Sequence, residues 1–132
     1  MAHPIEEQHR QLEVLFEGTR SAFGRGEVDA VRAGFERLRE ALDAHFDQED
    51  RLYYPPIAAL RPGHKIVVAG LGEAHAQFRI RFAEIADALA TASLAAAQRA
   101  FEAFVASFTR HEVIEEELVR SLESEVASAR QA

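Results

Sequence analysis

The sequence has 132 residues, of which 48% are hydrophobic and 28% are charged, a balance typical of one globular domain. It contains no cysteine, which excludes disulfide bonds, thiolate metal sites, iron–sulfur clusters and cysteine nucleophiles. The formal net charge is −7, so we expect neither nucleic acid nor an anionic membrane as a partner. No apolar run approaches the ~20 residues of a membrane span and the polar N-terminus is unlike a secretion signal, so we expect a cytoplasmic protein.

Hydrophobic residues recur at alternating steps of three and four, which indicates amphipathic helices. We predict four helices, at residues 4–23, 27–53, 66–90 and 94–127. Pro4 suits the first turn of the first helix, and Gly24-Arg25-Gly26 separates this helix from the second. Pro55-Pro56 predicts that the second helix ends near Tyr54, before the one long connection of the chain. Ser93 is expected to cap the fourth helix.

The helical pattern occurs twice, with an offset of 66 residues, so we predict one domain over residues 1–132 with repeat halves 1–66 and 67–132. The inward-facing positions of the first half are Ile5, His9, Leu12, Phe16, Thr19, Phe23, Val28, Val31, Phe35, Leu38, Leu42, His45, Glu49 and Leu52. Adding 66 to each position gives an apolar residue or the same histidine or glutamate. Short loops within each half then predict an all-α fold, an antiparallel up-down-up-down four-helix bundle.

Each predicted helix has one histidine on its inward face, and two helices add a glutamate one turn later. These six residues are His9, His45, Glu49, His75, His111 and Glu115. Because a helix rises about 1.5 Å per residue, counting from the turns places all six at one height of the bundle. Buried carboxylates need a cation or hydrogen bonds, and no lysine or arginine lies on these faces. The pattern therefore predicts two metal ions held by imidazole and carboxylate, which suit iron or manganese, with zinc as a further option.

A simpler interpretation is available for each motif taken alone. A single histidine on an apolar face is often a hydrogen-bonded core residue, and His45 with Glu49 is also an ordinary polar pair at helical spacing. The repetition of the motif on four helices favours a metal site over this interpretation.

Several neighbouring polar residues are not assigned as ligands. His3 and His64 have no counterpart in the other half and are expected to be exposed. The flanking residues Asp50, Glu116 and Glu117 are expected to turn away from the inward face. Glu115 and Glu116 are both candidates for the second carboxylate, and the repeat favours Glu115. Other residues with two open interpretations are Glu13, a surface residue or a support for His9, and Tyr53 and Tyr54, which either line the site or cover the end of the core.

The pattern of His9, HFDQE, His75 and HEVIE resembles the hemerythrin-like (HHE) cation-binding domain family over nearly the whole chain. The resemblance implies two non-haem iron ions joined by an oxo or hydroxo bridge. It further implies that His9 and His45 hold one iron, that His75 and His111 hold the other, and that Glu49 and Glu115 bridge both. Oxygen-carrying members have a second histidine one turn after the third-helix histidine, where this chain has Arg79.

We therefore expect a di-iron protein that binds, senses or reduces a small oxidant, namely dioxygen, peroxide or nitric oxide. Peroxidase-like, catalase-like or oxidase turnover is compatible with the pattern, although no residue requires it. The alternatives are oxygen carriage or iron storage without turnover, and a metal-free structural bundle. A monomer and a homodimer both fit the sequence, which does not specify a redox partner.

Overall fold

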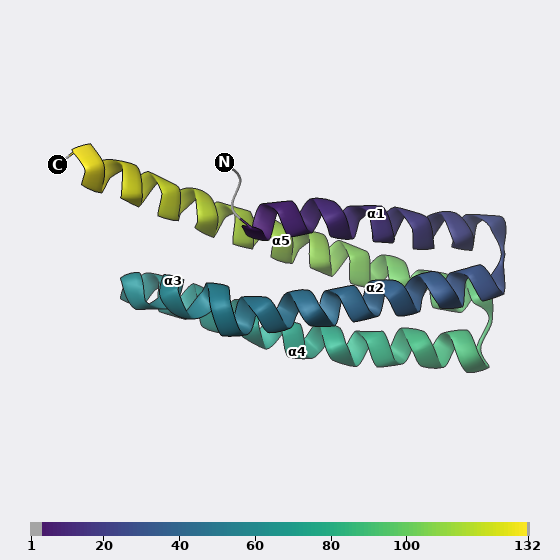
Figure 1. The fold of residues 1–132 in the computed structure, drawn as a ribbon. Helices are drawn as coiled ribbons and strands as arrows, with labels where there is room; N and C mark the ends of the chain where they lie inside the picture. Colours follow the sequence, from purple (N-terminus) through teal and green to yellow (C-terminus); the bar gives the residue numbers. More distant parts are fainter. Residues whose placement is uncertain (1–3, 132) are drawn as a thin grey trace.

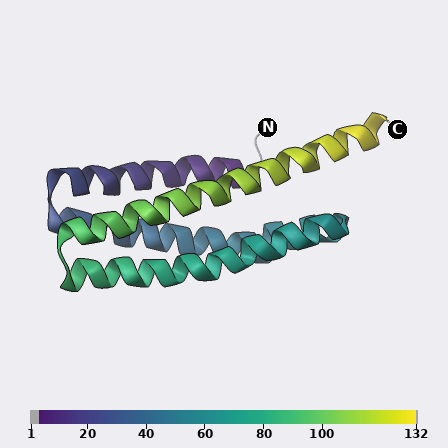
Figure 2. The same ribbon diagram turned by 180° about the vertical axis from the view of Figure 1, so that it is seen from behind.

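The computed structural model describes residues 4–131, which are almost entirely helical. The elements are α1 (Pro4–Arg25), α2 (Val28–Gln48), the π-helix η1 (Glu49–Tyr53), α3 (Tyr54–Leu60), α4 (Pro62–Thr91) and α5 (Leu94–Gln131). Figures 1 and 2 show α2, η1 and α3 as one continuous rod, so that the chain makes four rods lying side by side. The all-helical bundle predicted from the sequence is confirmed. Within residues 4–131, no helix has the length and hydropathy of a membrane span.

The turns α1–α2 and α4–α5 lie at the same end of the bundle (Figure 1). Gly26 ends α1 with φ +69°, a left-handed conformation that glycine adopts without strain. Its N–H donates to Phe23 O, and the Glu27 N–H donates to Ala22 O, which together form a Schellman cap. At the second turn, the Ser93 hydroxyl accepts a hydrogen bond from the Ala96 N–H, so the predicted cap is confirmed.

The predicted end of the second helix and the long connection after it are wrong. The rod continues through Pro55 and Pro56 to Leu60, and Arg61 alone links it to α4. A proline inside an α-helix lacks the N–H that the i−4 carbonyl needs and clashes with that carbonyl. Here the π-helix adds one residue before the prolines, with the Tyr54 N–H bonded to Glu49 O, so both prolines fall in the first turn of α3.

The extra residue of η1 also rotates the face that points inward. Leu52, predicted to be buried, is 61% exposed, whereas Tyr54 and Ile57 are buried. Val28, also predicted to be buried, is 40% exposed because it is the first residue of α2. The other positions predicted for the inward faces are buried, apart from Leu94, which is partly buried against the core.

The core consists of a large and a small apolar cluster. The large cluster is rich in phenylalanine and includes Phe46, Phe78 and Phe108. The small cluster consists of Ile5, Tyr54, Ile57, Leu71, Leu118 and Val119. On the first, third and fourth rods, the predicted histidine lies between the part that contributes to the large cluster and the part that contributes to the small one. On the second rod, His45 precedes Phe46, the last residue of the large cluster before Tyr54. The bundle thus has a polar layer enclosed by apolar packing on both sides.

Candidate metal centre

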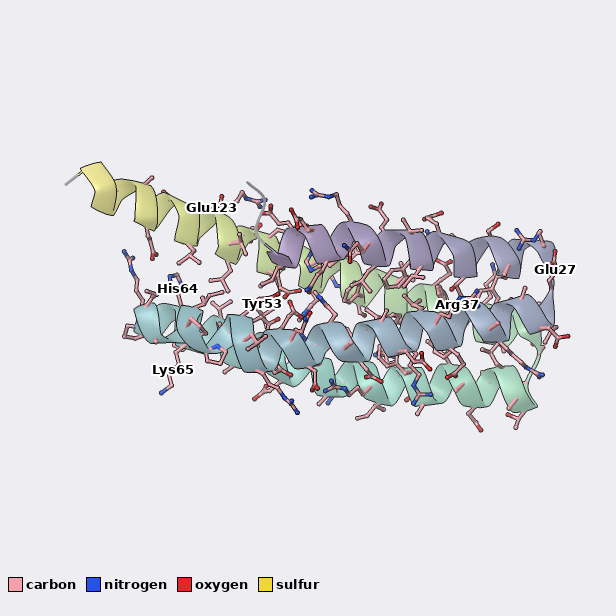
Figure 3. All side chains as sticks on the ribbon, in the orientation of Figure 1. Glu27, Arg37, Tyr53, His64, Lys65 and Glu123 are labelled. Atoms are coloured by element: carbon pink, nitrogen blue, oxygen red, sulfur yellow. The ribbon has the colours of Figure 1, made fainter. Side chains whose placement is uncertain are left out.

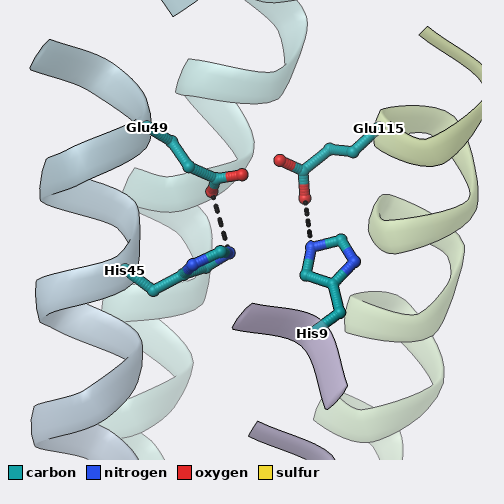
Figure 4. A group of neighbouring side chains, drawn as sticks. All are labelled: His9, His45, Glu49 and Glu115. Atoms are coloured by element: carbon teal, nitrogen blue, oxygen red, sulfur yellow. Dashed lines mark ion pairs between the residues drawn. The ribbon is translucent and has the colours of Figure 1, made fainter. Parts of the chain in front are cut away.

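All six residues proposed from the sequence pattern meet in this polar layer. They are His9, His45, Glu49, His75, His111 and Glu115, and each has at most 5% of its surface exposed. Figure 4 shows Glu49 and Glu115 pointing toward one another from the second and fourth rods. The height matching inferred from helical rise therefore describes the arrangement correctly.

The six side chains form two overlapping groups that share Glu49. In the first group, ligand atoms of His9, His45, Glu49 and Glu115 all lie within 4.8 Å of one another. The His45 Nε2 lies 3.3 Å from Glu49 Oε1, and the His9 Nε2 lies 3.4 Å from Glu115 Oε1 (Figure 4). This group has the donor atoms that a single metal ion would need.

The second group consists of Glu49, His75 and His111. The His75 Nε2 lies 3.1 Å from Glu49 Oε1, and the His111 Nε2 lies 3.2 Å from Glu115 Oε1. Each glutamate thus contacts one histidine of the first group and one of the second. The two carboxylates therefore lie between the two histidine pairs.

Several polar atoms of this layer have no hydrogen-bond partner among the described residues. They are the Nε2 atoms of His9 and His45, both carboxylate oxygens of Glu49, and Oε1 of Glu115. Buried polar atoms in proteins are nearly always paired, because leaving one unpaired costs about 1–3 kcal/mol. Five such atoms facing one another indicate a site that a cation completes.

The outer nitrogens of three histidines fix which ring nitrogen faces the interior. The His75 Nδ1 lies 3.1 Å from Asp50 Oδ1, the His45 Nδ1 contacts Gln8 Oε1, and the His9 Nδ1 lies 3.3 Å from Glu116 Oε1. Each partner is an oxygen that accepts, so each Nδ1 carries the proton and donates. Each Nε2 then presents a lone pair to the interior, which is the tautomer required of a metal ligand.

Asp50 and Glu116 turn away from the inward face, as expected, but they still contact the site from outside. Both carboxylates lie behind the cluster, at the outer nitrogens of His75 and His9. Their sequence numbers differ by 66, as do those of the two histidines, so the repeat contained the signal that identifies them. Glu115, the carboxylate favoured by the repeat, occupies the interior position.

His45 and His111 do not supply positive charge to balance the buried carboxylates. Burial, and then the neighbouring histidines, lower the pKa values of His45 and His111 to about 3. Both rings are therefore neutral near pH 7. Burial raises the pKa of Glu49, which shows that the cluster alone is a poor environment for its charge. A bound cation would remove this penalty.

A family model described as the hemerythrin HHE cation binding domain matches residues 1–122. The chain belongs to this family. None of the curated proteins and none of the solved structures compared with the chain gives a significant match. Membership in a cation-binding family agrees with a buried histidine–glutamate cluster that has the donor set of a metal site.

Tyr54 belongs to this hemerythrin-family site, although the sequence pattern left its role open. Its hydroxyl donates to Glu115 Oε2 over 2.8 Å and lies 3.3 Å from His75 Nε2. Its ring also stacks on His75, with the ring centroids 5.5 Å apart. The α-helical spacing used for the prediction could not place Tyr54 here, because the π-helix supplies the extra residue that turns it inward.

Phenylalanine rings cover the side of the cluster that faces the large core. Phe46 stacks on His75 with ring centroids 4.2 Å apart and an interplanar angle of 15°. Phe78 and Phe108 pack against His111. These rings restrict the motion of the imidazoles and exclude water from that side.

Arg79, at the position of the additional histidine in the oxygen carriers, lies outside the cluster. Its Nε donates to Asp43 Oδ1 over 3.1 Å, and its guanidinium carbon lies 5.7 Å from the centroid of Phe46. The group beside His75 in the interior is therefore the Tyr54 hydroxyl and not the Arg79 guanidinium.

The expectation that His64 is exposed is wrong. Its side chain is buried between α4 and the overhanging part of α5, with Nε2 3.0 Å from Glu125 Oε1 (Figure 3). The long α5, which extends beyond the start of α1, provides this cover (Figure 2). His3 lies outside the described residues.

Proposed function

We propose that the cluster holds two iron ions and that the protein uses them to bind, sense or reduce a small oxidant. The observation that carries this proposal is the set of five buried nitrogen and oxygen atoms that face one another and have no hydrogen-bond partner within the described part of the chain. Imidazole and carboxylate donors suit iron. Manganese and zinc accept the same donors, and metal analysis distinguishes them.

The proposed ligands follow the two groups of side chains. His9 and His45 would hold one iron, and His75 and His111 would hold the other. Glu49 and Glu115 would bridge the pair and balance its charge, an assignment supported by the contacts of each carboxylate with both histidine pairs.

The supporting residues would fix the imidazoles while leaving room for a small ligand. Four imidazoles and two carboxylates do not fill the positions around two iron ions, which commonly accept up to about six ligands each. Asp50, Gln8 and Glu116 hold the tautomers, and the phenylalanine rings exclude water. A bound iron pair would supply the redox chemistry, and Tyr54 would place a hydroxyl beside it.

The scaffold belongs to the same proposal. We propose an antiparallel up-down-up-down bundle built from two repeat halves of one domain. The turns α1–α2 and α4–α5 lie at the same end of the bundle, which supports the antiparallel arrangement (Figure 1). Asp50 and Glu116, which are 66 residues apart, contact the outer nitrogens of His75 and His9, and this equivalence supports the repeat.

The deciding experiment combines metal analysis with spectroscopy. Protein loaded with Fe²⁺ without oxygen is expected to bind two iron ions per chain, to develop near-ultraviolet absorption when oxygen or peroxide is added, and to consume the oxidant. The proposal would be overturned if the chain binds no metal, or if the absorption spectrum of the loaded protein does not change when either oxidant is added. An oxygenated form that releases dioxygen intact under vacuum would instead identify an oxygen carrier.

A further inference from the structure

A cavity of about 500 Å³ lies between α1 and α5 and reaches the wall of the metal centre. Five glutamates and three arginines line it, and burial raises the pKa of Glu112 to about 7, so the lining carries a small net negative charge near pH 7. One of the arginines, Arg20, is bound to Glu17 and Glu102. The carboxylates of Glu112 and Glu116 lie at the inner part of the cavity, beside His9.

His9 separates this cavity from the centre. Its Nδ1 lies 3.4 Å from Glu112 Oε2 and 3.3 Å from Glu116 Oε1, on the cavity side. Its Nε2, which has no hydrogen-bond partner among the described residues, lies 3.4 Å from Glu115 Oε1 on the inner side. The His9 imidazole, which is 5% exposed, therefore separates the acidic cavity from the buried ligands.

A second cavity, of about 190 Å³, reaches His45 between α1 and α2. Among the residues that the structure describes, none that lines it is acidic. Gln8 closes it on the inside, because its amide bonds both His45 and Gln48. The two openings thus differ in charge as well as in size.

We propose that the α1–α5 cavity is the entrance through which divalent cations reach the metal centre, with His9 as the side chain that they pass. This inference rests on the proposed function, since it requires that the centre bind metal. A cavity lined by carboxylates concentrates cations and lowers the barrier to their entry. The carboxylates behind His9 would receive a cation as it leaves the cavity, before the inner ligands bind it.

The test uses Co²⁺, which absorbs visible light when bound and does not react with oxygen at once. Two single variants obstruct the two openings: Thr109→Trp in the α1–α5 cavity and Ala44→Trp in the α1–α2 cavity. Both replaced residues are exposed, so both variants are expected to fold, which circular dichroism checks. Stopped-flow mixing of metal-free protein with Co²⁺ gives the rate of entry, and transfer from loaded protein to an excess of chelator gives the rate of exit.

We expect T109W to slow both entry and exit on the order of tenfold, because a close-packed obstruction raises the barrier in both directions. Its cobalt content at saturation should equal that of the unmodified protein. A44W should leave both rates unchanged. Equal rates in T109W and the unmodified protein, or a larger effect of A44W, would overturn the entrance.

A charge variant tests the electrostatic part without adding bulk. Glu13 lines the cavity one turn beyond His9, and Glu84 is an exposed glutamate on α4 that lies away from it. At low ionic strength, E13Q is expected to slow entry roughly three- to fivefold, and added salt should reduce this difference. E84Q should leave the rate unchanged, and a similar effect of both variants would overturn the role of the cavity carboxylates. If neither the unmodified protein nor any of the variants takes up cobalt, the metal centre itself is refuted.

Discussion

The hydroxyl of Tyr54 donates a 2.8 Å hydrogen bond to Glu115 Oε2, joining α3 to α5 inside the polar layer. Burial raises the pKa of Tyr54 above its ordinary value, so the phenol of the metal-free protein retains its proton across the physiological range. One carboxylate of the centre therefore has a fixed donor, whereas Glu49 has no hydrogen-bond partner for either oxygen among the described residues.

Replacing Tyr54 by phenylalanine removes this donor while preserving the ring. We expect Y54F to lower the free energy of unfolding of the metal-free protein by about 1 kcal/mol, because Glu115 Oε2 loses its partner in a buried position. Two metal ions per chain should still bind, with a changed absorption spectrum. Urea titration and metal analysis measure these effects. Y53F is the matched control: the Tyr53 hydroxyl accepts a 3.4 Å hydrogen bond from Gln8, so its removal should change the spectrum less than Y54F does. A spectrum of Y54F identical to that of the unmodified protein would contradict a place for the hydroxyl beside the metal.

Replacing Glu49 should remove metal, whereas replacing Glu13 should not. Glu49 is fully buried between both histidine pairs, and Glu13 is exposed one turn away from His9. We expect E49A to retain less than half of the metal of the unmodified protein and E13A to retain nearly all of it, measured by plasma emission on freshly purified samples. Equal metal content in the two variants would contradict the assignment of Glu49.

Asp50 is expected to strengthen metal binding without touching the metal. Its carboxylate holds the proton of the His75 Nδ1, and such partners commonly contribute about 10–100-fold in affinity. D50A should therefore weaken metal binding by roughly that factor in a chelator competition. Asp43, which binds Arg79 outside the cluster, provides the matched control D43A. An affinity of D50A equal to that of D43A would show that the contact with His75 has no such role.

Acidification should destabilise the metal-free protein. The pKa values of His45 and His111 are about 3 in the folded state, against the ordinary value of 6.5. Between these values the two imidazoles bind more protons in the unfolded chain than in the folded chain, so their contribution to stability is lost as the pH falls from about 6.5 toward 3. Burial raises the pKa of Glu49, and it raises the pKa of Glu112 to about 7, so these two carboxyls offset the two imidazoles above pH 4.5. The net loss of stability is therefore expected mainly between pH 4.5 and pH 3.

Urea titrations at pH 4.5 and pH 3 measure this effect. The midpoint is expected to be lower at pH 3 than at pH 4.5, and H45Q, which removes one of the two imidazoles, should show a smaller difference between the two pH values. Midpoints that do not change with pH in the unmodified protein would refute the depressed histidine pKa values.

The spacing of residues was sufficient to predict the six central side chains, because five lie on regular α-helix and Glu49 is the first residue of the π-helix, before the extra residue changes which side chains face inward. It was not sufficient where the helix departs from regularity. The extra residue of the π-helix turns Leu52 toward solvent and Tyr54 toward the interior. The same extra residue allows the rod to continue through Pro55. His64 is buried by contact with a distant part of α5, which local periodicity does not report.

The π-helix also distinguishes the two halves of the chain. The position 66 residues after Tyr54 is Arg120, an exposed residue of the uninterrupted α5, so the second half offers no equivalent phenol. Two matching halves would present a small guest molecule with two interchangeable orientations. With a hydroxyl on one side only, a small bound molecule would have one preferred orientation. That preference would originate in the main-chain hydrogen bonding of residues 49–53 rather than in the choice of metal-binding side chains.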